Sequence, residues 1–574
     1  MRTLPLAFLL AAACSSPDDG AGAEAPWVPE DLVPSEPDRV VDINAADDVY
    51  ETHLSAREAN IDIGGGEVVK MLTYGAQLPG PELRVQQGDR VIVHLDNELP
   101  DDFPTTIHWH GIEGTNAADG TPTTQGPILP GDRFTYDFRV PRPGIYWFHP
   151  HIRGAQTTHS GLYGTLVVED PDEPLLIESG ILPATRYTWV LSDLSVYQQK
   201  PVNTELDDDF ALMNGTEGEH LLINGEVMPT YDVPAGEGVR LQLLNTSITR
   251  YWRVSVPGHT IYRVGGENGL LEHVRVEGGS VEGEKVDLFS GEVLGTETIE
   301  HGYDRGELLL GPAERADVVI VPNGEVGDEV VVRWEDFARG RHGMWMEGDV
   351  MMMGDALDDG LRPGHDVAKL RIVEGNGASY ALAEGDPVLA AVGRRVQPID
   401  DSGDILDFTD GRGTELGESM EMVLDDDGKW IHLADFFIDN RSWMPDPMAG
   451  PSQPIAPNAR VVKLGDRILW EVHNTTMMSH PFHLHGFSYQ PVEFRRYEED
   501  EEDHRDAHDH YVRWPVEHVE FEDTTHIPSN TSLVFLVDIA DPNGDGGAIG
   551  RWMKHCHIFQ HGESGMMSEL VVEP

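Results

Sequence analysis

The sequence predicts an all-β protein built from sandwich domains, and composition, patterning and length each support this fold class. The 61 Gly and 39 Pro favour many tight turns between short strands. Short alternating apolar runs at residues 90–95, 239–244 and 532–537 are typical of sandwich strands. No long amphipathic helix pattern stands out. A length of 574 residues is too great for one hydrophobic core and suits about three domains of ordinary size.

The N-terminal residues 1–14 have the pattern of a secretory signal, with Arg2, an apolar core and three Ala before Cys14. This run is too short to remain as a membrane-spanning helix. Its ending resembles a bacterial lipoprotein signal peptide, which implies an exported protein of the cell envelope or periplasm, lipid-anchored at Cys14. Ordinary cleavage nearby is the alternative. Residues 15–47 are rich in acids and Pro and are expected to form a disordered tether.

Four pairs of histidines have the spacing His-x-His. They are His108/His110, His149/His151, His483/His485 and His555/His557. Residues two apart on a strand share a face and lie about 6.6 Å apart, so each pair directs two imidazoles to one side. A single pair is usually a surface feature or a satisfied core histidine, but four pairs in one chain make coincidence negligible. The pairs therefore predict a metal site shared by several strands.

The C-terminal run from His555 to Met566 predicts a second metal site. Cys556 is followed by His561 and Met566, and a thiolate, an imidazole and a weak thioether are the ligands of a blue copper. The chain has only one other cysteine, so Cys556 has no partner for a disulfide within the mature chain. On a strand, His555 and its pair mate point to the face opposite Cys556. One residue on each side therefore links the copper that accepts electrons to the site of the histidine pairs.

With these motifs the chain resembles the multicopper oxidases, the family of laccases, ascorbate oxidase, ferroxidases and bacterial cuprous oxidases. The resemblance covers nearly everything after about residue 50. It implies three cupredoxin-like Greek-key β-sandwich domains and four copper ions. The implied ligands are His480, Cys556 and His561 with axial Met566 for type 1, and His108 and His483 for type 2. The type 3 ligands are His110, His149 and His557 on one ion, and His151, His485 and His555 on the other.

The resemblance also divides the chain into domains. Residues 48–176 would form domain 1, residues 177–375 domain 2, residues 376–414 a linker and residues 415–574 domain 3. Domains 1 and 3 carry all the histidine pairs, so the trinuclear cluster of type 2 and type 3 ions is expected between them. Domain 2 carries none and is expected to be a structural spacer that could also form one wall of the substrate site.

The activity that the resemblance implies is oxidation of a reduced donor at the type 1 copper, coupled to reduction of O2 to water at the cluster. Cys556, His555 and His557 would carry the electrons. Asp119 follows the first histidine pair where related oxidases keep an acid beside the cluster, so we predict a proton relay there. The alternative is a turn residue before Gly120.

Two further positions bear on the redox chemistry. Gly562 stands where some relatives carry an acid after the last type 1 histidine, which leaves Glu563 as a weak candidate for a second proton donor. Met566 is an axial thioether, whereas family members with Leu or Phe there tend to be stronger oxidants. The protein is therefore expected to oxidise readily oxidised donors, such as electron-rich phenols, aromatic amines, Cu(I) or Fe(II).

Three segments bear on the choice of donor. Met residues cluster with acids in the segment Met344–Met353, and thioethers suit Cu(I); flexible apolar packing is the alternative. Met477 and Met478 precede His480, where core packing is at least as plausible. The acidic, His-containing segment Glu498–His510 either gathers cations or forms a solvated loop.

The net charge of −61 excludes nucleic acid as a partner and disfavours anionic substrates. Solubility in a salty habitat explains this charge equally well. The expected partners are O2 and a small reduced organic or metal-ion donor, with membrane contact only through the lipid at Cys14. The sequence indicates no oligomeric state.

Three functions remain in view. The first is a laccase-like oxidase, and the second is a dedicated envelope cuprous oxidase for copper tolerance. The third is a non-catalytic copper-binding envelope protein, which is disfavoured because no copper ligand is missing. Nitrite reduction is disfavoured by the complete set of histidine pairs.

Overall fold

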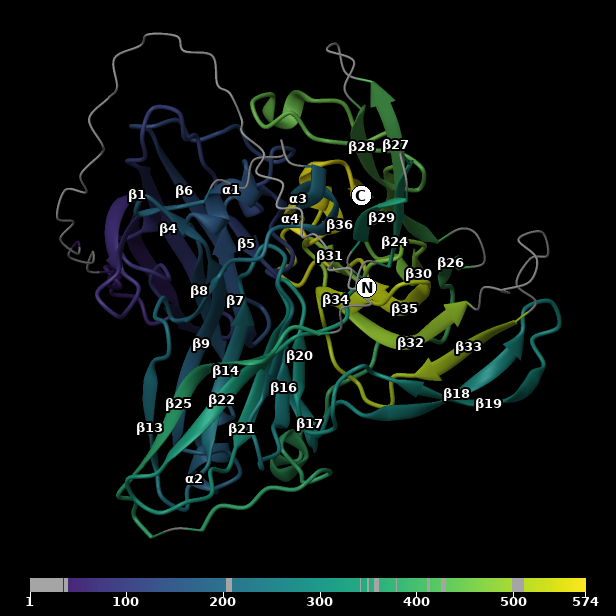
Figure 1. Cartoon of the computed structure of the whole chain (residues 1–574). Coiled ribbons are helices and arrows are strands. Elements are labelled where there is room, and N and C mark those ends of the chain that lie inside the picture. Colours follow the sequence, from purple (N-terminus) through teal and green to yellow (C-terminus); the bar gives the residue numbers. More distant parts are fainter. Residues whose placement is uncertain are drawn as a thin grey trace, which may run out of the picture.

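The computed structural model describes residues 35, 40–202, 209–340, 342–347, 350–355, 361–377, 379–409, 413–424, 430–497 and 510–574. Side chains at 209–211, 342–347, 350–355, 420–424 and 430–434 are not described. The predicted signal with Cys14, nearly all of the predicted tether up to residue 39, and residues 498–509 lie outside the described residues. Three double-sheet sandwiches follow one another along the chain (Figure 1), which confirms the predicted all-β fold.

The first sandwich packs the sheet β2-β1-β4-β6 against the sheet β3-β8-β7-β5. Its strands are β1 (Val49–Asp62), β2 (Val68–Tyr74), β3 (Leu83–Gln86), β4 (Arg90–Asn97), β5 (His108–His110), β6 (Arg133–Arg139), β7 (Gly144–His149) and β8 (Gly164–Glu169). Trp109, Tyr136 and Phe148 fill its core. Every residue of β7 is buried, because this strand also packs against the neighbouring sandwich.

The middle sandwich packs the sheet β12-β9-β14-β21-β16-β17 against β13-β25-β22-β15-β20. Its strands are β9 (Thr185–Leu194), β12 (His220–Ile223), β13 (Thr230–Pro234), β14 (Val239–Asn245), β15 (Trp252–Ser255), β16 (Tyr262–Gly266), β17 (Gly269–Arg275), β20 (Leu308–Leu310), β21 (Arg315–Ile320), β22 (Glu329–Glu335) and β25 (His365–Val373). Trp189, Trp252 and Trp334 anchor the core.

The C-terminal sandwich packs the sheet β19-β18-β33-β32-β35-β30-β27-β28, with β26 beside β30, against β29-β37-β36-β31-β34. Its strands are β18 (Ser280–Asp287), β19 (Val293–Glu300), β26 (Leu406–Phe408), β27 (Thr414–Leu424), β28 (Trp430–Ile438), β29 (Arg460–Lys463), β30 (Arg467–Asn474), β31 (His480–Leu484), β32 (Tyr489–Tyr497), β33 (His510–Pro515), β34 (Thr524–Ile527), β35 (Thr531–Asp538), β36 (Gly550–Cys556) and β37 (Met567–Glu573). Cys556 and Met566 belong to its core.

Two parts of this last sheet come from outside residues 415–574. The hairpin β18–β19 lies in the middle segment of the sequence, but β18 pairs with β33 through the register Glu284↔Arg513. Strand β26 lies in the predicted linker and pairs in parallel with β30. Long-range strand pairing therefore ties the middle segment to the C-terminal sandwich.

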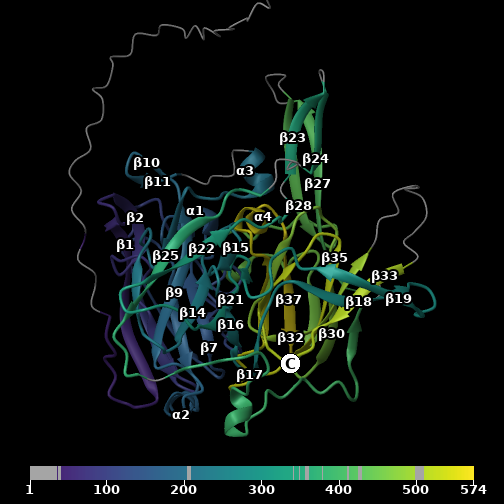
Figure 2. The same cartoon turned by 60° about the horizontal axis from the view of Figure 1, so that its bottom comes forward.

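The remaining elements are short. The helices are α1 (Gly154–His159), α2 (Glu173–Glu178), α3 (Asp209–Asn214) and α4 (Phe559–Glu563), with 3-10 turns η1 (Asn116–Ala118), η2 (Leu389–Val392) and η3 (Gly450–Ser452). Two further hairpins are β10 (Val196–Tyr197) with β11 (Lys200–Pro201), and β23 (His342–Glu347) with β24 (Val350–Asp355). Figure 2 shows β23–β24 standing out from the body of the sandwiches. Among the described residues, no helix has the length and apolar character needed to cross a bilayer.

The predicted strand segments are confirmed, since residues 90–95, 239–244 and 532–537 fall within β4, β14 and β35. The first and C-terminal sandwiches meet directly. The backbone N of Asn116 donates to Gly547 O at 2.9 Å, and α1 contacts α4 across the junction. Strands β5 and β7 on one side and β31 and β36 on the other bring the histidine pairs to this junction.

Candidate metal centre

The eight paired histidines converge where the first and C-terminal sandwiches meet. Strand pairing places His108 opposite His149 and His483 opposite His555. Between the sandwiches, His108 stacks on His485 with ring centroids 4.0 Å apart, and His110 stacks on His483 at 3.8 Å. Seven of the eight are buried and His151 is partly buried. Each sandwich therefore contributes half of one enclosed cluster of imidazoles.

Backbone carbonyls set the tautomers of four of these imidazoles. In each of the four, Nδ1 lies within hydrogen-bond distance of the backbone carbonyl oxygen of another residue. The pairs are His108 with Asp119 (2.8 Å), His149 with Pro150 (2.9 Å), His483 with Asp523 (2.8 Å) and His555 with Cys556 (2.9 Å). A carbonyl only accepts, so Nδ1 carries the proton and Nε2 carries the lone pair. Nε2 of His108, His149 and His483 is buried without a hydrogen-bond partner in the part of the chain that the structure describes. A buried imidazole nitrogen with a lone pair and no hydrogen-bond donor beside it is what a copper ligand has when its ion is absent.

The other members of the cluster support the same conclusion. His110 is reversed: Nε2 lies 3.0 Å from Thr524 Oγ1 and 3.0 Å from Asp523 Oδ1, and Nδ1 is buried without a hydrogen-bond partner among the described residues. Both ring nitrogens of His557 lack a hydrogen bond. Nε2 of His485 lies 3.0 Å from Nε2 of His555, although the Nδ1 contacts of both rings leave a lone pair on each Nε2. Two facing lone pairs repel, and a cation bound by both removes that repulsion, so the donor set fits copper ions.

Burial also fixes the charge state of these imidazoles. Desolvation lowers the pKa of His110, His149, His151, His485 and His557 well below the usual 6.5, and it lowers the pKa of His555 to about 3. These six rings are neutral near pH 7 and offer lone pairs rather than protons. This state is the one that metal binding requires.

Asp119 lies beside the cluster and also ends a turn. Its carboxylate oxygens lie 3.1 and 3.3 Å from Nδ1 of His485, and Oδ1 lies 3.2 Å from Nδ1 of His108. It caps η1, and the following Gly120 has a φ of 74°, where a Cβ would lie 1.7 Å from Ile107 O. A role as a turn residue and a role as a proton relay are therefore compatible, because the turn brings the carboxylate to the imidazoles.

The predicted blue-copper residues form a second group on the other side of β36. Nδ1 of His480 lies 3.2 Å from Cys556 Sγ, Nδ1 of His561 lies 4.0 Å from the same sulfur, and the two Nδ1 atoms are 3.3 Å apart. Met566 is buried in the same core, and its carbonyl accepts from Cys556 N at 3.1 Å. Burial raises the pKa of the Cys556 thiol well above its usual value of 9.0, so a thiolate here needs a bound cation.

The outer nitrogens of this second group are covered by protein. Nε2 of His480 lies 2.8 Å from Thr476 Oγ1, and Nε2 of His561 lies 3.0 Å from the carbonyl of Met213 in α3. Both histidines are 0% exposed, and Phe436 stacks on His561 at 4.1 Å. The Met213 contact comes from the middle segment of the chain. Sequence reasoning missed it because a backbone carbonyl leaves no residue-type signal.

The remaining residues noted in the sequence are the second candidate proton donor, the Met residues and the acidic segment. Glu563 lines a cavity of about 290 Å³ together with His151 and His555, and burial raises its pKa to about 7. Met478 is buried in the core, as the packing alternative states, whereas Met477 is 41% exposed. The segment Met344–Met353 lies within the β23–β24 hairpin, but its side chains and residues 348–349 lie outside the described part of the structure. Residues 498–509 of the acidic segment also lie outside them.

Comparison with known proteins connects this geometry to a family. Residues 55–173 and 419–574 each match a family described as multicopper oxidase. Multicopper oxidase MmcO of Mycobacterium tuberculosis is 28% identical over 461 residues, covering 76% of each chain. An iron transport multicopper oxidase of Kluyveromyces lactis is 26% identical over 552 residues, covering 90% of this chain and 74% of the relative.

A solved structure shares the fold. The multicopper oxidase of Campylobacter jejuni, described as a metallo-oxidase, aligns with a TM-score of 0.65 at 21% identity, covering 95% of this chain and 96% of that one. The predicted three cupredoxin-like domains are thereby confirmed. The chain belongs to the multicopper oxidase family and is a copper-dependent oxidoreductase whose cofactor is a set of four copper ions, one type 1, one type 2 and two type 3.

Proposed function

We propose that this protein couples one-electron oxidation of a reduced donor to four-electron reduction of O2, so that four donors, one O2 and four protons yield four oxidised donors and two waters. The observation that carries this proposal is the pairing of two sites through Cys556. Its thiol lies with His480 and His561, whereas the flanking His555 and His557 belong to the imidazole cluster on the opposite face of β36. Bound copper supplies the redox chemistry that these side chains lack.

The ligands proposed for each ion follow the resemblance to the multicopper oxidases. Type 1 copper is assigned to His480, Cys556 and His561 with Met566 axial, and type 2 copper to His108 and His483. The type 3 ions are assigned to His110, His149 and His557, and to His151, His485 and His555. Ligand atoms of His151, His485 and His555 lie within 4.8 Å of one another, which supports the last assignment.

The chain's own residues give the route and the protons. Cys556 joins the two sites through one peptide unit on each side, which is the shortest covalent connection the backbone allows. Asp119 is proposed to hold a proton on its carboxylate and to pass it toward the cluster, because it contacts both His485 and His108. Glu563, in the cavity beside His555, is a candidate for a second proton donor.

The donor is proposed to be an electron-rich phenol or aromatic amine, as in a laccase, or a metal ion. The structure offers two observations in favour of a small metal-ion donor, Cu(I) or Fe(II). The outer nitrogen of each type 1 imidazole has a protein partner, Thr476 Oγ1 for His480 and the carbonyl of Met213 for His561, so neither nitrogen is available to hydrogen-bond an aromatic donor. Relatives described as an iron transport oxidase and a metallo-oxidase agree with this choice.

The second observation concerns the Met-rich hairpin. The backbone at its base is attached to the segment before His480. Ser479 N donates to Arg339 O at 2.8 Å. A Cβ on Gly340 would lie 2.0 Å from Met477 O, so glycine allows this close contact. The β23–β24 hairpin therefore begins at His342, two residues after this backbone contact with the segment before His480, and the connection supports a role of the hairpin in delivering metal-ion donors.

The proposed location is the cell envelope or periplasm, with a lipid anchor at Cys14. The support is the sequence pattern of residues 1–14 and the acidic stretch that follows. Labelling of the expressed protein with a radioactive fatty acid, compared with a Cys14→Ala variant, tests the anchor. Absence of label in the wild type would contradict it.

O2 uptake by the copper-loaded protein tests the function, with Cu(I), Fe(II) and a methoxyphenol supplied at equal concentrations. Replacing Met344–Met353 by a short Gly-Ser turn should abolish a preference for Cu(I) and leave phenol oxidation intact. Phe289→Ser, in the exposed β18–β19 turn, is the matched control and should change neither rate. A phenol preference indifferent to the replacement would establish a laccase, and no O2 uptake with any donor would refute the oxidase proposal.

A further inference from the structure

The middle sandwich supplies no cluster histidine, yet it sends one arginine to the back of the cluster. Arg315 begins β21 and its side chain is 0% exposed. Nη1 and Nη2 donate to Oδ1 and Oδ2 of Asp523 at 2.8 and 2.5 Å, and Nε donates to Ile145 O at 2.7 Å. Nη1 also forms an ion pair with Glu267 at 2.9 Å. One guanidinium therefore joins three sandwiches, because Ile145 belongs to β7 and Asp523 directly precedes β34.

Asp523 is the point where this arginine reaches the copper ligands. Its Oδ1 lies 3.0 Å from Nε2 of His110, and its backbone oxygen accepts from Nδ1 of His483 at 2.8 Å. Thr524 Oγ1 lies 3.0 Å from the same nitrogen and donates to Asp523 Oδ1 at 3.0 Å, so this hydroxyl also accepts from His110. Because the ionised carboxylate and the hydroxyl both accept, the proton of His110 is held on Nε2 and the lone pair on Nδ1. The tautomer of His110 is thus opposite to that of His108, His149, His483 and His555, and a side chain rather than a backbone carbonyl sets it.

The surrounding backbone is shaped for this contact. Gly111 has a φ of 88°, and a Cβ there would lie 2.5 Å from Asp523 Oδ2 and 2.8 Å from Arg315 Nη2. Oε2 of Glu267 accepts from the backbone N of Asp523 at 2.7 Å and of Thr524 at 3.0 Å. Arg315 therefore holds the carboxylate of Asp523, and Glu267 holds the backbone of Asp523 and Thr524.

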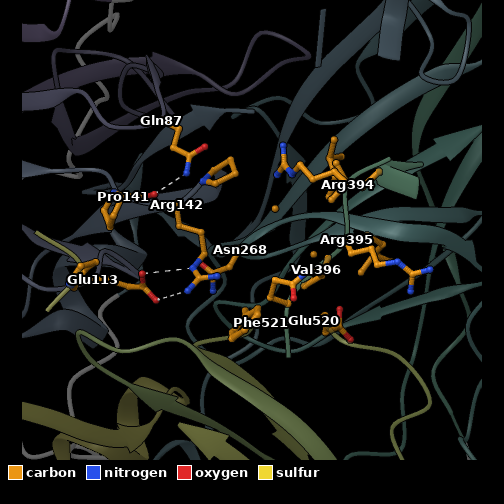
Figure 3. A pocket seen from close by; sticks show the side chains of 18 residues that line it. Gln87, Glu113, Pro141, Arg142, Asn268, Arg394, Arg395, Val396, Glu520 and Phe521 are labelled. Carbon is orange, nitrogen blue, oxygen red and sulfur yellow. Dashed lines mark hydrogen bonds and ion pairs between the residues drawn. The ribbon is translucent and has the colours of Figure 1, made fainter. Parts of the chain in front are cut away.

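A cavity lies beside the contact between Asp523 and Arg315, on the side of Asn268. It has a volume of about 340 Å³, and Arg142, Asn268 and Phe521 line it (Figure 3). Nδ2 of Asn268 donates to Asp523 Oδ2 at 3.4 Å, so a side chain that lines the cavity contacts the carboxylate. Without Arg315, the Asp523 carboxylate would have an alternative position toward this cavity, where water can solvate it.

We propose that Arg315 is a positioning residue for the trinuclear cluster: it holds Asp523 where the carboxylate keeps the proton of His110 on Nε2 and so presents Nδ1 to copper. The inference rests on the copper ligands proposed above. A group that orients a ligand through its second ring nitrogen typically changes metal affinity about 10–100-fold when it is removed. The middle sandwich is therefore part of the metal site and more than a spacer.

The test compares Arg315→Gln and Arg315→Lys with a matched control, Arg240→Gln. Arg240 lies in β14 of the same sandwich, is 2% exposed, and donates to both oxygens of Asp317 at 2.8 and 2.5 Å. This pair is also a buried, two-pronged arginine–aspartate contact, formed through Nε and Nη2 of Arg240, and no histidine takes part in it. Copper per chain is measured at limiting free copper, together with the blue absorbance, the electron paramagnetic resonance of type 2 copper, and the melting temperature.

Arg315→Gln should bind the cluster ions about 10–100-fold more weakly and change the type 2 resonance, while the blue absorbance stays at wild-type strength. Arg315→Lys keeps the charge, which favours folding. Its affinity for the cluster ions should lie between those of Arg315→Gln and the wild type, because one ammonium reaches Asp523 but not Ile145 O as well. Arg240→Gln should melt at a lower temperature with unchanged copper binding.

Wild-type copper affinity and resonance in both Arg315 variants would overturn the inference, as would equal loss of cluster copper in Arg240→Gln. If Arg315→Gln does not fold, Arg315→Lys decides alone. A wild type that binds only type 1 copper would contradict the proposed function as well, whereas normal copper in the wild type and in the Arg315 variants contradicts only this inference.

Discussion

Asp119→Asn should slow O2 consumption sharply while the copper sites stay intact. Asn keeps a carbonyl oxygen that can accept from Nδ1 of His485, now 3.1 Å from Asp119 Oδ1, and the backbone bond from His108 Nδ1 to Asp119 O is unchanged. Replacing a charged acceptor by a neutral one weakens such a bond by about 1 kcal/mol, or roughly 5-fold in rate. Loss of a proton relay lowers the rate by about 10²–10⁴-fold. A fall beyond 100-fold therefore indicates proton transfer and not ligand positioning.

The assay for Asp119→Asn has two parts. Steady-state O2 uptake reports turnover, and anaerobic bleaching of the blue absorbance by the same donor reports electron entry alone. Turnover should fall and bleaching should not. Thr121→Val is the control, since Thr121 Oγ1 donates to Asp119 Oδ2 at 3.0 Å and its loss leaves the carboxylate able to carry a proton. Turnover within 10-fold of the wild type, or equal losses in both variants, would refute the relay and leave Asp119 as a turn residue.

The other predictions concern the sulfur ligand, a turn, a buried acid and the metals. Cys556→Ser should lose the blue absorbance and all oxidase activity, and retained O2 turnover would contradict electron entry at this residue. Gly120→Ala places a Cβ 1.7 Å from Ile107 O and should lower the melting temperature far more than Gly131→Ala, which has a similar positive φ and no atom within 4 Å. Burial raises the pKa of Glu314 from 4.5 to about 7, so between these values the unfolded chain releases a proton that the native state retains. Stability should therefore fall with rising pH by up to about 3 kcal/mol across this window, and denaturation of Glu314→Gln should show a flatter pH dependence. Removing copper with a chelator should lower the melting temperature and reloading should restore it, because an ion that binds only the native state stabilises it by mass action.

Local spacing explains why so much of the candidate site could be predicted. Residues two apart on a strand share a face whatever the rest of the fold does, so His108 and His110, the two ends of β5, had to point together. His485 directly follows β31, and its ring centroid lies 4.6 Å from that of His483. The same rule separates Cys556 from His555 and His557. Gly and Pro content and length were enough for an all-β fold of several sandwiches, because these quantities constrain turns and core size rather than particular contacts.

Other features had no local signal. The hairpin β18–β19 joins the C-terminal sheet by pairing with β33, more than 200 residues along the chain, and strand propensity does not specify a distant partner. The cover over His561 is a carbonyl of Met213, and every residue type carries a carbonyl. The sequence-based expectation for the middle segment named neither this contact nor Arg315.

The sequence by itself determined which side chains can bind copper and the order in which the strands present them, since ligand type and two-residue periodicity are local properties. Only the tertiary structure decided which ring nitrogen each histidine turns toward the cluster, because that choice depends on the acceptor placed behind the ring. For His110 this acceptor is Asp523, held by Arg315 from a segment 208 residues away in the chain. Contacts of that range arise from the packing of three sandwiches and are absent from any short stretch of sequence.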